Sequence, residues 1–361
     1  MAKEEKKAIG KKTFSLDAYK VTNKLNDGVK DKPLEYIQLS PAFQTVTGIS
    51  IVKGIVNLLR GFSNTGKSTA LIESAIGAQR QGILPIIIDT ENGWNWEHAR
   101  AMGFEFTDVQ GEVTNEETGE VTTETVNYEG FFIYINNDYL IENFGKKRDK
   151  NRDEAVIEDV AEFMNKTLDD QNEGNLEYEL LFCFDSIGTL DCEQCITAKS
   201  RNNMWNAGAY EAAFKSLINY RIPASRKTNK KFTNTLVAVN KIWIDNMGMG
   251  VVMNKGGNAF MYGARLVFHF GGVQSQGIKK LIAKANGKDY HYGTQTKVSV
   301  EKNHINGTSN NGVIISTAHG FKMPEEMEEY KKQYKNYFIT QLGMSLNTEV
   351  TFAEEDLNPG E

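Results

Sequence analysis

The stretch "GFSNTGKST", residues 61–69, decides the fold of this chain. It fits the pattern G-x-x-x-x-G-K-[ST], whose glycines let successive backbone N–H groups turn inward around phosphate oxygens. In that pattern the lysine, here Lys67, reaches the β- and γ-phosphates, and the next hydroxyl, here Ser68, is a ligand of Mg²⁺. The whole stretch is therefore predicted to contact phosphate: Gly61, Phe62, Ser63, Asn64, Thr65, Gly66, Lys67, Ser68 and Thr69.

The segments on either side supply the context that this motif requires. Residues 54–62, "GIVNLLRGF", predict a buried strand, and residues 67–82 carry apolar side chains at helical spacing. A phosphate-binding loop of this kind joins a strand to a helix. Motif and context together predict a P-loop nucleotide site that takes ATP with Mg²⁺.

Buried apolar strands alternate with amphipathic helices along the rest of the chain. Further strands are expected at 84–92, 131–136, 178–186, 234–241, 264–272, 278–285 and 296–303. Helices are expected at 95–103, 153–168, 210–227 and from residue 323 onward. Such alternation predicts an α/β fold, with a mostly parallel twisted sheet covered by helices on both faces.

The sequence also suggests how the chain is divided. Residues 1–37 are polar and predict an N-terminal arm for oligomerisation, residues 38–322 an ATPase core, and residues 323–361 a helix with an acidic tail. Residues 109–130 are polar and rich in threonine around a turn signal, which predicts an inserted β-hairpin.

Composition limits the classes of function. No apolar run approaches the roughly 18 residues of a membrane span, and the N-terminus lacks the apolar core of a signal peptide, so we expect a cytoplasmic protein without a membrane partner. The net charge of −6 argues against whole-protein attraction to nucleic acid but leaves room for a local basic groove. Cys192 and Cys195 form a lone C-x-x-C, for which small buried or loop cysteines are a better interpretation than a zinc or redox site.

Acidic residues follow two of the predicted strands. Asp185 ends the apolar strand "LLFCFDS" and is the expected carboxylate that holds Mg²⁺. Asp89 and Glu91 end "IIIDTEN" and lie on one face of it, so either could orient the attacking water. We favour Glu91, because ligands of open α/β sheets bind just past the strand ends, and the alternative role for Asp89 is a turn acid.

Two long irregular segments follow strand ends and are predicted to contact DNA. The first, residues 187–208, contains Lys199, Arg201 and Trp205. The second, residues 242–258, is rich in Met and Gly, which suits sequence-tolerant contact with single strands, although a methionine-lined flap over the core is the alternative. The candidate DNA-binding residues are Arg201, Met247, Met249, Met253, Lys255, Gly256, Gly257 and Asn258.

Four segments, in this order, resemble the RecA/RadA recombinase family, and most of all its phage UvsX-like members. They are "GFSNTGKST", "IIIDTEN…ARAMG", "LFCFDSIGTL" and "LVAVNK…NKGGNAFMYGARL". The resemblance covers residues 38–305, and the "GGNA" segment after an Asn-ending strand is its most specific part. It implies a RecA-type P-loop NTPase core.

The resemblance also implies roles for residues around the nucleotide. Glu91 matches the family's catalytic glutamate. Asn95 and His98 fall where the family has an adenine-contacting acid and an aromatic, and Trp96 is a substitute for stacking on the base. After the matching Asn240, Lys241 stands in place of the family's glutamine that senses the γ-phosphate.

The last pair of implied residues concerns the neighbouring subunit. Lys302 matches the first of two basic residues that reach the neighbour's ATP, and His304 replaces the second with a group that titrates near neutral pH. The resemblance thus implies that the catalytic set is Glu91, Lys67, Lys241 and Lys302.

The activity implied is that of an ATP-dependent recombinase that forms helical filaments on single-stranded DNA and exchanges strands with duplex DNA. Single-strand-binding and mediator proteins would be further partners. One alternative is a hexameric helicase with the same core, although such enzymes usually carry a separate N-terminal domain. Another is a mediator paralogue with weak turnover, which Lys241 and His304 keep open, and a circadian-type or signalling ATPase is more distant.

Overall fold

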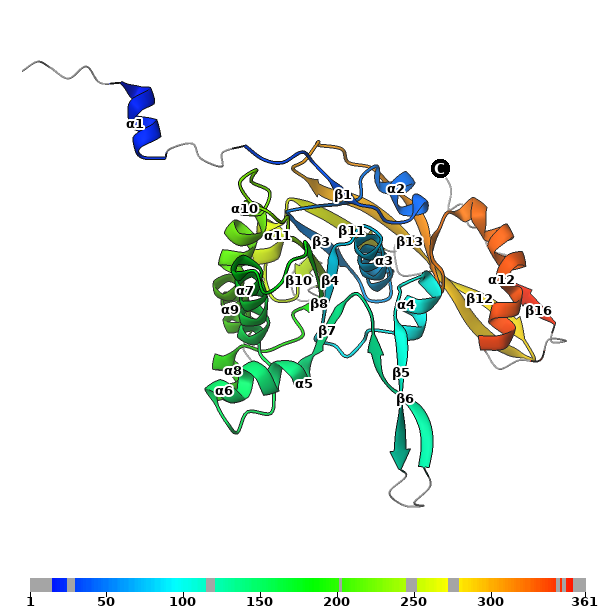
Figure 1. Cartoon of the computed structure of the whole chain (residues 1–361). Helices are drawn as coiled ribbons and strands as arrows, with labels where there is room; N and C mark the ends of the chain where they lie inside the picture. Colours follow the sequence, from blue (N-terminus) through cyan, green and yellow to red (C-terminus); the bar gives the residue numbers. More distant parts are fainter. Residues whose placement is uncertain are drawn as a thin grey trace, which may run out of the picture.

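A mixed sheet of 12 strands runs through the chain (Figure 1). The computed structural model describes residues 15–24, 30–114, 121–200, 203–244, 252–271, 279–341, 345 and 349–352. Along the main path the strand order is β15-β14-β13-β11-β3-β9-β8-β4-β7. The α/β class predicted from the sequence is confirmed.

One half of the sheet is parallel, from β11 to β7. Its register places Asp89 opposite Asp185 and Gly61 opposite Lys241. Because the carboxyl ends of parallel strands meet at one edge, these residues gather there. The parallel strands are β3 (Val56–Gly61), β4 (Leu84–Asp89), β7 (Ile133–Asn136), β8 (Leu180–Ile187), β9 (Thr235–Ile244) and β11 (Leu266–Gly271).

The other half is antiparallel, so the expectation of a mostly parallel sheet is wrong. β13 pairs antiparallel with β11, β12 and β14. Only Asn286 and Gly287 separate β12 from β13, both with positive φ, and such a two-residue turn can join only antiparallel strands. The strands of this half are β12 (Lys279–Ala285), β13 (Lys288–Asn303), β14 (Asn311–Thr317), β15 (Gly320–Lys322) and β16 (Val350–Phe352). A further antiparallel strand, β10 (Val252–Asn254), pairs with β9.

Helices cover both faces of the parallel half (Figure 1). Successive strand residues enter opposite cores: Phe182 packs beneath one set of helices and Cys183 beneath the other, which explains the continuous apolar strands. The first set is α7 (Ile157–Glu173), α9 (Asn203–Ser216) and α11 (Ala259–Gly263); the second is α2 (Pro41–Thr47), α3 (Lys67–Gln79) and α4 (Trp96–Met102). Within the described ranges, no helix combines the length and apolar character needed to cross a bilayer.

A separate small core lies in the antiparallel half. There α12 (Met327–Gln341) contributes Met327 and Tyr330, which pack with Leu281 of β12 and Tyr292 of β13. This core therefore attaches the C-terminal helix to β12 and β13 rather than to the parallel strands.

The hairpin of β5 (Thr107–Thr114) and β6 (Val121–Glu129) projects from the body (Figure 1). At its root Trp96 stacks on Tyr128, with ring centroids 4.5 Å apart, and also contacts Phe106, Phe132 and Tyr134. Trp96 thus packs on the hairpin and does not line the cavities near residues 61–69, which corrects its suggested role in base stacking.

The remaining elements are short. They are α1 (Leu16–Thr22), α5 (Asn137–Leu140), α6 (Lys146–Arg148), α8 (Glu193–Thr197), α10 (Ile222–Ala224), β1 (Tyr36–Ile37), β2 (Ile51–Val52), π-helical turns at Ile141–Gly145 and Leu217–Arg221, and a 3₁₀ turn at Pro324–Glu326.

The two segments expected to be irregular contain regular structure. In the first, Leu190, Cys192 and Cys195 are buried in the core, and α8 and the start of α9 lie within it. In the second, β9 continues to Ile244 and β10 pairs back onto it, so its ends form an antiparallel ladder. Residues 245–251 lie outside the described residues.

Candidate nucleotide site

A cavity of ≈ 550 Å³ opens beside the 61–69 loop. Two acidic groups from neighbouring strand ends, Glu91 and Asp185, face the loop across it, as the parallel register requires. The cavity is lined by Ser63, Asn64, Thr65, Gly66, Lys67, Ser68, Thr69, Glu91, Asp185, Val239, Lys241, Lys280, His291, Thr294 and Ser316. Gly61 and Phe62 form the end of β3 and the turn behind the cavity.

Lys67 is held at the base of this loop. It is buried, and its ammonium donates hydrogen bonds to the Phe62 carbonyl and, at 3.4 Å, to the Thr65 hydroxyl. Burial lowers the pKa of Lys67 to about 8, although the charge of Asp185 opposes that shift. A buried ammonium surrounded by loop carbonyl and hydroxyl groups is suited to bind an anion that enters the cavity.

Asp185 and Ser68 form the candidate metal position. The Ser68 hydroxyl lies 3.5 Å from Asp185 Oδ2. Burial, together with the charges of Glu91 and Asp89, raises the pKa of Asp185 to about 6. A hydroxyl and a carboxylate are the hard oxygen donors that Mg²⁺ prefers, and Mg²⁺ usually takes few protein ligands besides phosphate and water. The pair therefore fits Mg²⁺ held together with a phosphate.

No group of three or more His, Cys, Asp or Glu side chains within the described ranges forms a metal cage of its own. A cation at Ser68 and Asp185 would therefore need oxygens from the ligand. Such dependence is usual for Mg²⁺ in phosphate sites.

Asp89 and Glu91 have different surroundings. Asp89 is buried and accepts hydrogen bonds from the backbone N–H groups of Glu91, Gly93 and Trp94 and from the Tyr134 hydroxyl. All of these contacts fix the turn after β4, so Asp89 is a turn acid. Glu91 instead lines the cavity.

Both carboxylate oxygens of Glu91 are engaged. Oε1 accepts a hydrogen bond from Ser186, and Oε2 forms an ion pair with Lys241. Burial acts to raise the pKa of Glu91, but the hydrogen bonds from Lys241 and Ser186 outweigh it and lower the pKa below its ordinary value. Glu91 is thus held ionised, with its charge opposed by a lysine.

Lys241 connects the cavity to the second predicted DNA segment. Its side chain pairs with Glu91, while its carbonyl accepts a 3.0 Å hydrogen bond from the backbone N–H of Lys255. The ladder continues with Ile242 opposite Asn254 and Trp243 opposite Met253. A shift of Lys241 would therefore act directly on residues 252–255.

Gly256 and Gly257 adopt positive φ, 71° and 80°. A Cβ on Gly256 would lie 2.8 Å from the Tyr210 ring, and one on Gly257 would lie 2.8 Å from Ala207 Cβ. These glycines are needed for close packing against α9, and their contact with DNA stays a prediction.

Asn258 occupies the first position before α11. Its side chain accepts a hydrogen bond from Asn254 Nδ2 at 2.8 Å and makes no capping bond to the helix. From the sequence, Asn258 is expected either to contact phosphate or to start the helix as its cap. It does stand at the N-cap position of α11, but without a capping hydrogen bond from its side chain, and the phosphate contact stays a prediction.

Two exposed members of the predicted DNA set precede the Gly256–Gly257 turn. Met253 and Lys255 are exposed on or just after β10. Lys199 is exposed with positive φ, whereas Trp205 packs partly against the core. Arg201, Met247 and Met249 lie outside the described residues.

A second cavity, of ≈ 790 Å³, adjoins the first, because His291, Thr294 and Ser316 line both. Asn95 and His98 line its other wall. The Asn95 side chain caps α4 through His98 N, and His98 Nε2 lies 3.2 Å from the Thr317 carbonyl. Both positions predicted to contact a base are thus brought beside the cavity at the 61–69 loop.

Lys302 and His304 line neither cavity. The Lys302 ammonium donates to the carbonyls of Met261 (3.0 Å) and Tyr262 (2.9 Å), and His304 is exposed. Within one chain they are therefore separate from the 61–69 loop.

Cys192 and Cys195 are buried and not joined by a disulfide bond, with 3.3 Å between their sulfur atoms. They pack in the core with Leu190, so the simple interpretation of small buried cysteines is confirmed.

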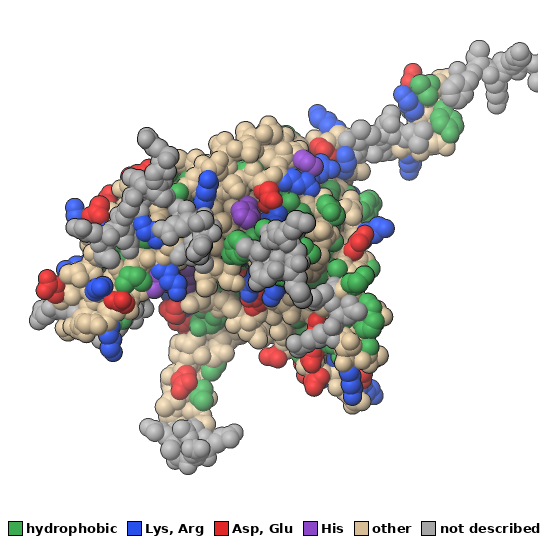
Figure 2. All heavy atoms as spheres, turned by 180° about the vertical axis from the view of Figure 1, so that it is seen from behind, with side chains coloured by type: hydrophobic (Ala, Val, Ile, Leu, Met, Phe, Trp, Pro, Cys, Tyr) green, Lys and Arg blue, Asp and Glu red, His purple; other side chains and the backbone are tan. Residues whose placement is uncertain are grey.

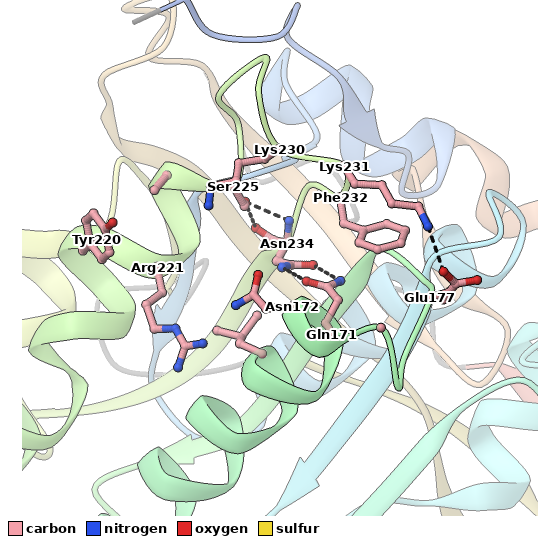
Figure 3. Close-up of a pocket in the computed structure, with 13 residues that line it drawn as sticks. Gln171, Asn172, Glu177, Tyr220, Arg221, Ser225, Lys230, Lys231, Phe232 and Asn234 are labelled. Carbon is pink, nitrogen blue, oxygen red and sulfur yellow. Dashed lines mark hydrogen bonds and ion pairs between the residues drawn. The ribbon is translucent and has the colours of Figure 1, made fainter. Parts of the chain in front are cut away.

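Another cavity, of ≈ 480 Å³, lies at the amino ends of β8 and β9 (Figure 3). Its floor is an amide pair in which Gln171 and Asn234 each donate to the other, at 3.0 and 2.6 Å. Asn234 also bonds to Ser225 and to the backbone of Leu180. Because these polar groups are satisfied by one another, we interpret the cavity floor as a structural connection between α7 and β9.

Several residues at the nucleotide site were missed by the sequence reasoning. Ser186 follows Asp185 directly, so its position beside Glu91 could have been suggested. Ser316, whose hydroxyl lies 2.7 Å from that of Thr69, and Lys280 and His291 come from distant antiparallel strands. No local sequence signal links those three to the 61–69 loop.

No protein-family model matches this sequence, and no curated protein matches it.

Proposed function

We propose that the protein is an ATP-dependent recombinase of RecA type, in the style of phage enzymes, which assembles on single-stranded DNA and pairs it with duplex DNA. The observation that carries the proposal is the direct connection, through Lys241, between the cavity beside the 61–69 loop and the segment that contains Met253 and Lys255. A P-loop alone fits many ATPases, whereas this connection supplies a route from nucleotide to a second ligand.

In the proposed mechanism the 61–69 loop and Lys67 bind the phosphates of ATP. Ser68 and Asp185 would hold Mg²⁺, which neutralises phosphate charge when bound. Glu91 would accept a proton from, and orient, the attacking water. The base would occupy the adjoining cavity beside His98.

In this mechanism Glu91 can act as a base only once its ion pair with Lys241 is broken. While Lys241 neutralises Glu91, the carboxylate is a poor base; a γ-phosphate offers Lys241 a competing anion. Movement of Lys241 toward phosphate would free Glu91 and pull on residues 252–255 through the β9–β10 ladder. Nucleotide binding and DNA binding would then favour each other, as linkage requires.

The distribution of charged side chains favours attraction of DNA by a local cation rather than by the net charge of the whole protein. Acidic and basic side chains are interspersed over the face seen in Figure 2, in keeping with the net charge of −6. The exposed residues on and just after β10 combine Met253 with Lys255, an apolar side chain for bases and a cation for phosphate.

The test is the ATPase rate of the full chain with and without single-stranded DNA, combined with negative-stain imaging. The proposal expects DNA-stimulated turnover and helical filaments, both lost in Lys67→Ala. Closed six-membered rings that unwind duplex would instead identify a helicase. An unchanged rate in Lys67→Ala would overturn the site itself.

A second candidate is a mediator that binds ATP and DNA without productive turnover. The ion pair that occupies Glu91 favours it. Filaments or DNA binding that require ATP, without measurable hydrolysis, would select this candidate.

A further inference from the structure

Lys280 lines the cavity beside the 61–69 loop and comes from the antiparallel half of the sheet. It lies opposite Thr294 in the β12–β13 ladder, and Thr294 lies opposite Ser316 in the β13–β14 ladder. The Ser316 hydroxyl in turn lies 2.7 Å from the Thr69 hydroxyl in the 61–69 loop. This continuous row fixes Lys280 across the cavity from the loop.

The position of Lys280 favours contact with phosphate over contact with the base. Thr294, Ser316 and His291 line both cavities, whereas Lys280 lines only the one that contains Glu91 and Asp185. A cation there faces the part of the cavity in which a polyphosphate would lie.

The other two lysines of the cavity already have partners. Lys67 donates to the Phe62 carbonyl and Lys241 pairs with Glu91. Lys280 is exposed at the cavity wall, and it lies near enough to His291 for its charge to lower the pKa of that histidine, in addition to the larger effect of burial. His291 therefore favours the neutral form, and among the described residues Lys280 is the cation on this wall.

We propose that Lys280 binds the terminal phosphate of a nucleoside triphosphate held by the 61–69 loop. The antiparallel half of the sheet then contributes a phosphate-binding cation from within the same chain, distinct from any group that a neighbouring subunit supplies. This inference rests on the proposed ATP site.

The experiment compares Lys280→Ala with Lys284→Ala, which removes another exposed lysine of β12 that lines neither cavity. Affinities of the full chain for a non-hydrolysable ATP analogue and for ADP, each with Mg²⁺, are measured by calorimetry. Loss of one charge-assisted contact predicts that Lys280→Ala weakens the triphosphate about tenfold and ADP less than about threefold. Lys280→Arg should restore most of the triphosphate affinity.

Two results would overturn the inference. One is a triphosphate affinity for Lys280→Ala equal to that of Lys284→Ala; the other is an equal loss for triphosphate and ADP, which would assign Lys280 to an inner phosphate. Failure of the ATP site itself is distinguishable, because the wild-type chain would then bind neither nucleotide, or Lys67→Ala would bind both normally.

Discussion

At the scale of single residues, Asp185 combines a proposed Mg²⁺-binding role with a cost to stability. Its pKa is raised from 3.8 to about 6, so the folded chain holds this proton more tightly than the unfolded chain does. Ionised Asp185 therefore destabilises the fold above about pH 6, and the effect disappears as the pH falls toward 3.8. A bound cation would remove this cost.

Asp185→Asn should raise the free energy of unfolding of the nucleotide-free protein by about 1–3 kcal/mol at pH 7.5. The gain should shrink toward pH 4.5, where the wild-type carboxyl is largely protonated. Urea unfolding at both pH values measures this, with Asp289→Asn, an exposed aspartate, as the control. An equal gain at both pH values would contradict a raised pKa for Asp185. ATP hydrolysis should be lost in Asp185→Asn and kept in Asp289→Asn.

Lys241→Gln tests the ion pair with Glu91. Without the ammonium, Glu91 is no longer neutralised, so the ATPase rate without DNA should rise about threefold or more, and stimulation by DNA should fall. Because Lys241 lowers the pKa of Glu91, its loss should raise that pKa and move the acid limb of kcat/KM to higher pH. A parallel loss of rate at every pH would show instead that Lys241 only binds phosphate.

At the scale of elements, the turn after β10 depends on two glycines with positive φ. Gly256→Ala should destabilise the chain by about 2–4 kcal/mol, because a left-handed alanine costs about 1 kcal/mol and its Cβ overlaps Tyr210. Gly174→Ala is the matched control: its φ is 86°, with nothing within 4 Å of the added Cβ. Thermal unfolding compares the two, and equal losses would show that backbone conformation alone matters.

Local sequence patterns predict some of these elements and miss others. The strand, loop and helix around residues 61–69 are predictable because motif and hydrophobic period agree locally. The extension of β9 and its pairing with β10 were missed, since Met and Gly in residues 242–258 suggest irregular backbone. The Asn286–Gly287 turn was an available signal for antiparallel strands.

At the scale of the whole molecule, the parallel and antiparallel halves both line the cavity beside the 61–69 loop, where the Ser316 hydroxyl of β14 lies 2.7 Å from that of Thr69. An ATP analogue should therefore slow amide hydrogen exchange in β12, β13 and β14 as well as in the 61–69 loop. Exchange measured by mass spectrometry with and without the analogue tests this, with Lys67→Ala as the control. Protection confined to the parallel half would contradict a shared cavity.

Some residues of this cavity could be predicted from the sequence, and others could not. Asp185, Glu91 and Lys241 follow strand ends of the parallel half, so strand order along one edge brings them together. Lys280 and Ser316 lie on β12 and β14, which pair with their chain neighbour β13. They reach the 61–69 loop only because β13 pairs with β11, and β11 pairs with β3, which lies far away in the chain. Such long-range register depends on the complete fold, which no local pattern encodes.

The β9–β10 ladder has one practical consequence. Trp243 lies on it two residues after Lys241, opposite Met253, and its side chain is 44% exposed. Its indole is an intrinsic fluorophore located between the nucleotide cavity and the proposed DNA segment. Emission that shifts with an ATP analogue in the wild-type chain, but not in Trp243→Phe, would let the coupling be followed in real time without any label.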